Sequence, residues 1–253
     1  MIDLKSEAEV NRMRAACAAA ARVLQDLSSL VVPGVSTAGL DAAARGLMTR
    51  HGCESACHGY VVGRLTYPGY VCISVNDEIV HGIGAPDRII RDGDLVSLDV
   101  VVRREGFIGD NARTIVVGNA PAEALALCRD TENALHAGIA AVKPGNRVGD
   151  ISAAIQAALS PQGYGIVRDF VGHGVGRQMH EEPQIPNFGK AGTGPKLLAG
   201  MALAIEPMVN LGTHKIIMAA DGWTARTADG KVSAHFEHTV LVTEKGAEIL
   251  TLP

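Results

Sequence analysis

The chain has 253 residues, of which 47% are hydrophobic, and it carries a formal net charge of −4. This length supports one large domain or two small ones with a buried core. The missing basic excess and the aromatic content of only 4% argue against nucleic acid as a partner.

The N-terminal sequence MIDLKSEAEV is polar and lacks the apolar core of a signal peptide. Nowhere does the chain contain the run of about 18 apolar residues that a membrane span needs. We therefore expect a cytoplasmic protein without a membrane partner.

The five cysteines are an odd number in a chain too large to need disulfide bridges, so we expect reduced thiols. Cys53 and Cys57, with His58 beside them, could suggest zinc. No second ligand cluster follows at zinc-finger spacing, and we interpret these cysteines as small buried apolar residues.

The first predicted elements are two helices. Apolar residues recur at helical spacing over 6–30, and a second amphipathic helix should run from an N-cap at Ser36 or Thr37 to Gly52. The Pro33-Gly34 turn separates the two helices.

The same unit occurs again 111 positions later, where Pro144 matches Pro33 and Gly163 matches Gly52. A long helical stretch precedes both copies, over 8–30 and 122–142. This internal repeat, about 8–118 and 122–245, predicts two similar halves. Because no flexible linker separates them, we expect a single catalytic domain spanning 1–253.

Strands follow the helices in each half. YVCISVNDEIVHGI, DLVSLDVVVRREGF and NARTIVVG lie in the first, and GIVRDFVGHGVG, MALAIEPMVN, KIIMAADGWTART and SAHFEHTVLVTE in the second. Helices and strands are segregated rather than alternating, which predicts an α+β fold with antiparallel sheets, helices covering them, and pseudo-two-fold symmetry. A cleft between the halves is a natural place for a site.

The stretch GHGVGRQMHEEP, 172–183, contains two histidines and two glutamates. It is no phosphate loop, because Pro183 and Pro186 prevent the helix that should follow the glycines. The histidines are seven apart, so it is no zinc-protease helix either. We expect two extended segments that present His173 and His180 near one cavity, with Glu181 and Glu182 structuring the loop.

Four carboxylates stand inside otherwise apolar strands: Asp99 and Asp110 in the first half, Glu206 and Glu237 in the second. Any single one could be a satisfied core carboxylate. The repeat, however, aligns LVSLD with ALAIE, and the hairpin partner of each strand should carry the second acid. Four anions in one cavity require cations. Four carboxylates and an imidazole form the ligand set of a two-metal hydrolytic site, for Mn, Fe, Co or Zn.

Six motifs in order, NDEIVHGI, SLDV, GDNARTI, GHGVGRQMHEEP, AIEPM and FEHTV, closely resemble those of the type I methionine aminopeptidases in their bacterial form, over essentially the whole chain. The resemblance implies a pita-bread fold and a dinuclear-metal methionyl aminopeptidase. Its substrates would be nascent polypeptides, met at the ribosome, whose initiator methionine is removed when the second residue is small. We expect a monomer.

The resemblance also implies the roles of individual residues. Asp110 and Glu237 would bridge two divalent metal ions, Asp99 would bind one of them, and His173 and Glu206 the other. His81 and His180 would contact the scissile amide, and Glu206 would also shuttle a proton. The methionine pocket would include Cys57, Tyr60, Tyr67, Cys72, Met179 and Trp223.

Two features depart from the family pattern, and both concern this pocket. Met179 stands where the family usually has phenylalanine. The segment between Cys57 and Cys72 is a few residues longer than expected and contains Arg64.

Three alternatives remain: a proline-directed aminopeptidase of the same fold, a non-catalytic pita-bread binding protein, and a structural protein whose acids form ion pairs. The proline-directed enzymes have an additional N-terminal domain for which this chain has no room. A non-catalytic relative should lack metal ligands, and ion pairs would need basic residues near the acids.

Overall fold

The computed structural model describes residues 2–253. Within this range the helices are α1 (Glu7–Ser28), α2 (Thr37–Arg50), α3 (Ala122–Ala140), α4 (Val148–Leu159) and the 3-10 helix η1 (Ser160–Gln162). The strands are β1 (Glu54–Ser55), β2 (Val61–Val62), β3 (Leu65–Thr66), β4 (Cys72–Val75), β5 (Glu78–Val80), β6 (Leu95–Arg104), β7 (Phe107–Val116), β8 (Gly165–Ile166), β9 (Gly172–Gly174), β10 (Glu181–Ile185), β11 (Ala202–Ile205), β12 (Met208–Asn210), β13 (Ile216–Met218), β14 (Ala225–Thr227), β15 (Ser233–His235), β16 (Glu237–Thr243) and β17 (Gly246–Ile249).

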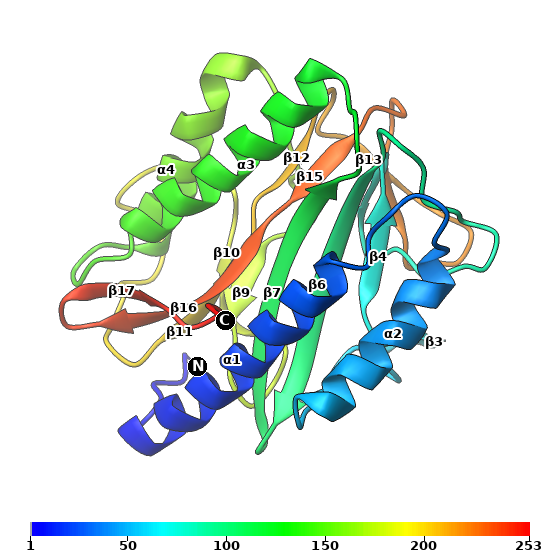
Figure 1. Ribbon diagram of the computed structural model, residues 1–253. Helices are drawn as coiled ribbons and strands as arrows, with labels where there is room; N and C mark the ends of the chain where they lie inside the picture. The colour runs from blue at the N-terminus through cyan, green and yellow to red at the C-terminus, as the bar shows by residue number, and fades with distance from the viewer. Residues whose placement is uncertain (1) are drawn as a thin grey trace.

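The helices follow the periodic patterns of the sequence. Ser36 is the N-cap of α2, and its hydroxyl accepts a hydrogen bond from the Gly39 amide at 3.1 Å. The two helices α3 and α4 repeat the arrangement of α1 and α2 in the second half (Figure 1). The predicted helical repeat is therefore present in the structure.

The main sheet has the strand order β1-β6-β7-β16-β11-β9-β10, with β4 beside β6 and β17 beside β16, and every pair is antiparallel. Strands of the two halves meet where β7 pairs with β16. Three smaller sheets, β15-β12-β8, β13-β14-β5 and β2-β3, complete the architecture. The α+β class predicted from the sequence is confirmed.

The expectation that each half would use a hairpin to hold its two acids is wrong for the second half. Strands β6 and β7 do form a hairpin. Strands β11 and β16 are antiparallel neighbours, but residues 206–236 lie between them and form four further strands. The repeat therefore preserves the pairing of the two strands and not their connection.

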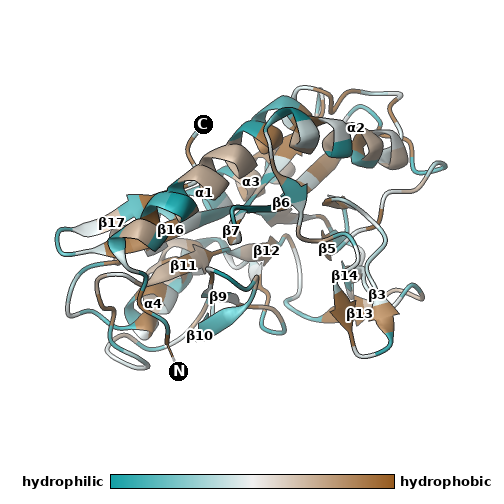
Figure 2. Cartoon of the chain, turned by 90° about the horizontal axis from the view of Figure 1, so that it is seen from below, coloured by the Kyte–Doolittle hydropathy of each residue, from teal (hydrophilic) through white to brown (hydrophobic). Residues whose placement is uncertain are grey.

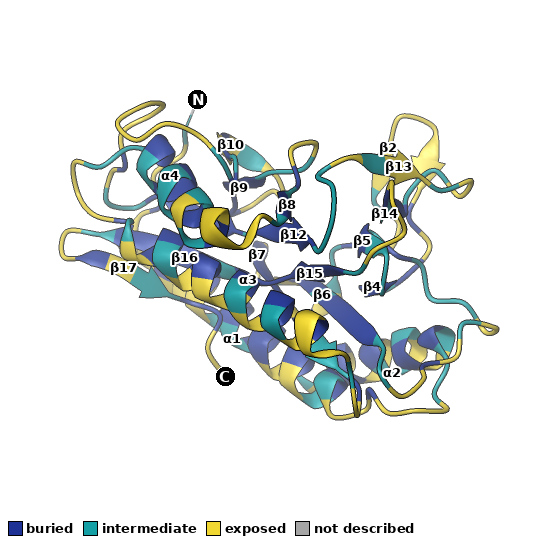
Figure 3. Cartoon of the chain, turned by 90° about the horizontal axis from the view of Figure 1, so that it is seen from above, coloured by how far each residue is buried: buried dark blue, intermediate teal, exposed yellow. Residues whose placement is uncertain are grey.

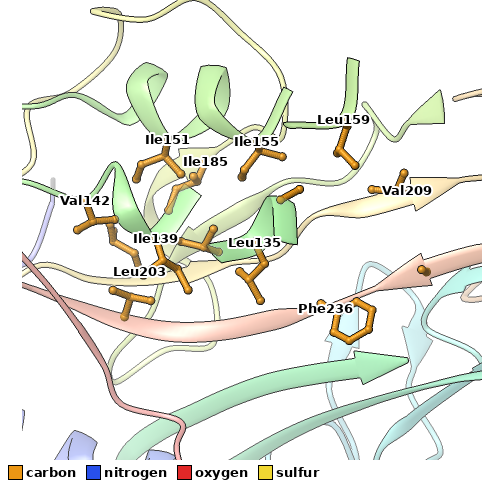
Figure 4. Packing of buried hydrophobic residues seen from close by; sticks show 14 of the residues in the cluster. Leu135, Ile139, Val142, Ile151, Ile155, Leu159, Ile185, Leu203, Val209 and Phe236 are labelled. Atoms are coloured by element: carbon orange, nitrogen blue, oxygen red, sulfur yellow. The ribbon is translucent and has the colours of Figure 1, made fainter. Parts of the chain in front are cut away.

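Each half has its own hydrophobic core. Residues of α1 and α2, including Val23 and Leu40, pack against β4 and β6 in the first half. In the second, Leu135 and Ile139 of α3 face Ile151 of α4 and the strands β11 and β16 (Figure 4). This apolar packing holds the two ends of the main sheet in place.

A further apolar cluster lies where the halves meet. It joins Met13 of α1 and Phe107 of β7 to Ala204 of β11. Most residues of the long β6 strand are buried (Figure 3). The central strands thus form a rigid base on which polar side chains can be fixed.

All five cysteines are buried and unbridged, as expected. His58 stacks on Tyr70 with 4.4 Å between the ring centroids, and Cys53 and Cys57 belong to different apolar clusters. The interpretation of Cys53 and Cys57 as buried apolar residues is consistent with this packing. Among residues 2–253, no helix combines the length and apolarity needed to cross a membrane.

Candidate active site

A cavity of about 250 Å³ lies over the central strands where the two halves meet. Its lining is Cys57, Tyr60, Val62, Tyr67, Cys72, Val80, His81, Asp99, Val101, Asp110, Phe170, Val171, His173, Met179, His180, Glu206, Met208, Trp223, His235 and Glu237. All of the residues that the sequence analysis singled out for catalysis, metal binding and the substrate pocket are in this set.

The register of the β6–β7 hairpin places the two acids of the first half on one face. Asp99 lies opposite Ala112, and Val101 lies opposite Asp110. Residues two apart on a strand share a face, so Asp99 and Asp110 are diagonal neighbours on the same side of the sheet.

The second half contributes side chains to the same face, because β16 pairs with β7 and places Glu237 opposite Ala112. The small side chain of Ala112 therefore lies between two carboxylates, those of Asp99 and Glu237. Farther along, Ala204 is opposite both Thr239 and His173. Because Thr239 shares a face with Glu237, His173 lies on that face as well.

The distances bring these side chains into one group. Ligand atoms of Asp110, His173 and Glu237 lie within 4.8 Å of one another. His173 Nε2 lies 3.3 Å from Glu206 Oε1 and 4.0 Å from Asp110 Oδ2. The Nδ1–H of His173 donates to the Gly174 carbonyl at 2.9 Å, which leaves the Nε2 lone pair facing the acids.

Burial dominates the electrostatics of the acids. It raises the pKa of Asp99 to about 6 and that of Glu206 to about 8. The pKa values of Asp110 and Glu237 are raised well above their usual range, first by burial and then by the neighbouring carboxylates. Such a cluster is costly unless cations neutralise it.

The protein itself supplies little compensation. No lysine or arginine is among the described residues that line the cavity. Asp99 Oδ1, Glu237 Oε1 and His235 Nε2 are buried without a hydrogen-bond partner. Buried polar atoms are nearly always satisfied in folded proteins, so these three atoms indicate the position of a ligand. The donor set of carboxylates and one imidazole fits divalent metal ions.

Two more histidines border the acid group. His81 sits in a left-handed backbone conformation with φ 60°, and burial lowers its pKa to about 4. The ring of His180 lies 4.5 Å from that of His173, and its Nδ1 lies 2.8 Å from the Tyr60 hydroxyl. If the Tyr60 hydroxyl donates to Nδ1, then Nε2 of His180 carries the proton.

Another part of the cavity wall is apolar and rich in sulfur, and it adjoins the acids where Cys72 of β4 pairs with Asp99 of β6. The six residues predicted for the substrate pocket belong to one hydrophobic cluster: Cys57, Tyr60, Tyr67, Cys72, Met179 and Trp223. The rings of Tyr67 and Trp223 meet edge to face at 5.3 Å, and the Tyr67 hydroxyl donates to the Gly82 carbonyl at 2.7 Å. These contacts fix the aromatic side chains against the sulfur atoms.

The sequence analysis missed His235, which is buried with its Nε2 3.6 Å from Glu206 Oε2. Burial lowers its pKa. A signal was available, because His235 precedes Glu237 by two positions and residues at that spacing share a strand face. It also missed the apolar lining residues Phe170 and Met208.

The two glutamates of the stretch 172–183 have no atom in the cavity lining. Glu181 forms an ion pair with the buried Lys5 and accepts a hydrogen bond from the Gln178 amide at 3.1 Å. Glu182 is exposed. Glu181 thus ties the N-terminal segment to the start of β10, in agreement with the structural role predicted for it.

Known proteins with similar sequences align with this chain over nearly its full length. Residues 11–244 match the model of metallopeptidase family M24. The chain is 49% identical to methionine aminopeptidase B of Synechocystis over 98% of this chain and 91% of that protein. It is 43% identical to methionine aminopeptidase 1 of Bacillus subtilis over 99% of both chains.

Solved structures of related proteins have the same fold as this chain. The methionine aminopeptidase of Thermotoga maritima superposes with a TM-score of 0.97, at 42% identity and over 100% of both chains. The prolidase of Pyrococcus furiosus gives a TM-score of 0.78 over 99% of this chain and 65% of that one; at 24% identity it shows the shared fold alone. The predicted pita-bread fold is confirmed, and the chain belongs to metallopeptidase family M24.

Proposed function

We propose that this protein is a metal-dependent aminopeptidase that removes the N-terminal methionine of polypeptides whose second residue is small. One observation carries the proposal. A single small cavity joins a wall of metal-ligating side chains to a wall of sulfur and aromatic side chains. The first wall suits hydrolysis and the second suits an unbranched thioether.

Five residues would hold a pair of divalent metal ions: Asp99, Asp110, His173, Glu206 and Glu237. The unsatisfied atoms of Asp99 and Glu237 support this assignment, as does the lack of lysine and arginine in the lining. When bound, such ions lower the pKa of water and polarise the scissile carbonyl group. Cobalt, manganese, iron and zinc all suit these ligands.

The side chains of the protein would position and protonate the substrate. Burial favours the neutral form of His81. The Tyr60 hydroxyl, donating to Nδ1, would hold His180 in the neutral form that carries its proton on Nε2. Each ring could then donate a hydrogen bond to the scissile amide without repelling the metal ions. Glu206 Oε1 lies 3.3 Å from His173 Nε2, among the proposed ligands, where a carboxylate can accept a proton and pass it to a neighbouring group. We assign it the proton transfer to the leaving amine.

The apolar wall would select methionine. Typical ligand sites enclose roughly 300–1,000 Å³. This cavity has about 250 Å³, so it suits one side chain and a short stretch of backbone. A large second residue would have to share the space beside the acids, and we infer that small second residues are preferred.

Two further assignments belong to the proposal. The ligands come from both halves, so we treat the chain as one catalytic domain. We assign nascent chains at the ribosome as the physiological substrates of a monomeric enzyme.

The proposal is tested by incubating the metal-reconstituted protein with Met-Ala-Ser and with a peptide containing Ala-Pro. Methionine should be released from the first peptide, and a chelator should abolish the release. Release that persists in chelator would disprove the metal mechanism. Cleavage only before proline would establish the proline-directed alternative, and no cleavage with metal bound would favour a binding protein.

A further inference from the structure

We infer that an exposed apolar surface beside the cavity binds the substrate chain beyond its second residue, and that it favours apolar residues at the fourth and fifth positions. The surface, called the apolar rim, consists of Val61, Val62, Leu65, Ile217 and Met218. This inference rests on the proposed function and adds a second element of specificity to it.

The rim is an unusual concentration of exposed apolar side chains. Val61 is 61% exposed, Ile217 53% and Met218 50%. The hairpin of β2 and β3 and the strand β13 form a strongly hydrophobic region at this end of the molecule, and most of their residues are exposed (Figures 2 and 3). Clustered apolar residues at a surface generally mark a site of interaction.

The rim is continuous with the cavity. Among the residues lining the cavity, only Val62 and His180 are exposed, so these two mark its mouth. Val62 belongs to the β2–β3 hairpin. A Cβ atom added to Gly222 would lie 2.8 Å from Leu65 Cδ1, so this hairpin touches the turn between β13 and β14. Trp223, in the same turn, lines the cavity.

The dimensions agree with a peptide leaving the cavity. The sheet order β13-β14-β5 places β13 two strands from Val80 of β5, which lines the cavity. Two strand spacings are about 10 Å, and an extended chain covers about 3.3 Å per residue. Three residues beyond the second therefore reach from the cavity to β13.

The side chains of β13 add a second argument. Exposed edge strands usually carry charges or proline, whereas β13 reads Ile-Ile-Met and exposes Ile217 and Met218. Met218 is opposite Ala225 of β14, and Ala225 is opposite Val80 of β5 in the cavity lining. A chain that crosses these strands from the cavity therefore meets apolar side chains.

The test compares three substrates with the metal-reconstituted enzyme: Met-Ala-Ser, Met-Ala-Ser-Leu-Val-Lys and Met-Ala-Ser-Ser-Ser-Lys. The apolar hexapeptide should have a kcat/KM about tenfold above that of the polar one, mainly through a lower KM, as expected for an additional apolar contact. Equal values for the two hexapeptides would overturn the inference.

The test variant combines Val61→Ser, Ile217→Ser and Met218→Ser, which spares Val62 in the cavity wall. It should abolish the preference and leave Met-Ala-Ser cleavage unchanged. The matched control, Leu125→Ser with Leu198→Ser, alters exposed leucines on other elements (49% and 48% exposed) and should keep the preference. A preference that survives in the rim variant, or that the control also loses, contradicts the inference.

Two measurements separate other outcomes. Sedimentation of wild type and rim variant shows whether a second copy covers the rim; a dimer that the variant dissociates would overturn the inference.

Hydrogen exchange of the metal-free protein with each hexapeptide reports binding without cleavage. Protection of 61–66 and 215–219 by the apolar peptide alone supports the rim even if methionine is not released, an outcome that would refute only the proposed function. Equal or absent protection contradicts the rim.

Discussion

The two walls of the cavity are built in different ways. The acid wall lies on the central strands β6, β7, β9 and β16 and just beyond β11, where the register of the sheet fixes each side chain. Most of the apolar wall comes from short strands and connecting segments, namely 57–67, Met179 and Trp223, which side-chain packing holds in place. Cys72 is the exception, because it lies on β4 of the main sheet opposite Asp99. The sheet thus fixes the proposed metal ligands, whereas connecting segments carry His81, His180 and most of the apolar wall.

The walls also differ in their effect on stability. The apolar wall removes Cys57, Tyr67 and Cys72 from water, which stabilises the fold. The acid wall buries carboxylates, and no lysine or arginine is among the described residues of the cavity lining, so this burial destabilises the metal-free fold. Variants in the two walls should therefore give different, separable phenotypes.

The largest effect is expected for Glu237→Gln in the acid wall. Metal ions contribute several kcal/mol to the transition state, and about 1.4 kcal/mol corresponds to tenfold in rate, so kcat/KM should fall about a thousandfold. Metal content, measured by elemental analysis, should fall as well. The exposed Glu182→Gln serves as the matched control and should retain both. Full metal content and activity in Glu237→Gln would remove this residue from the ligand set.

His180→Ala tests whether His180, at the mouth of the cavity, takes part in the reaction without binding metal. Loss of one hydrogen-bond donor to the reacting group costs about 10²–10³ in kcat. We expect that loss, with KM for Met-Ala-Ser and metal content little changed. Tyr60→Phe removes only the hydroxyl 2.8 Å from His180 Nδ1 and should have a smaller effect. Loss of metal in His180→Ala would instead make this histidine a ligand.

Trp223→Ala addresses the apolar wall. Removing the indole that meets Tyr67 edge to face should raise KM for Met-Ala-Ser about tenfold, because it deletes apolar contact with the methionine side chain. The value of kcat and the metal content should stay close to those of wild type. Thermal unfolding of the variant controls for general destabilisation. A fall in kcat with unchanged KM would contradict the separation of the two walls.

The smallest effect concerns the pH dependence of stability in the metal-free protein. In the folded protein the pKa values of Asp99 and Glu206, about 6 and 8, exceed the values of 3.8 and 4.5 that the groups have in water. At these acids the folded state therefore binds more protons, and their contribution to stability is lost as the pH rises through the folded pKa values. The pKa values of His81 and His173, lowered by burial to about 4, act in the opposite direction below about pH 6.5. The net decrease in stability is therefore expected between about pH 6.5 and 8. Each pKa unit corresponds to about 1.4 kcal/mol, so the decrease should be a few kcal/mol.

This loss is measured by chemical unfolding of metal-free protein at several pH values. The double variant Asp99→Asn with Glu206→Gln should flatten the profile, and added divalent metal should restore stability at pH 8. Stability that instead rises over this range would show that the acids are compensated within the protein.

The sequence made the acid wall predictable and the apolar wall much less so. A carboxylate inside an apolar strand, such as Asp99 in LVSLDVVV, is costly enough to stand out without a structure. Cysteine and tyrosine are ordinary core residues, and only the resemblance to a family assigned them to a pocket. His235 was overlooked because a single histidine in a strand has a plausible core role.

Periodicity and buried charge are local properties, so the amino-acid sequence was enough to predict the helical repeat, the α+β class and the four carboxylates inside apolar strands. The choice of His173 as the fifth proposed ligand came from the resemblance to a family. The tertiary structure alone decided that β11 and β16 pair across residues 206–236 and that Ala112 lies between Asp99 and Glu237. It also placed the apolar rim beside the mouth of the cavity. Such features depend on the pairing of strands distant in the chain, and pairing is set by the packing of the whole sheet rather than by any one segment.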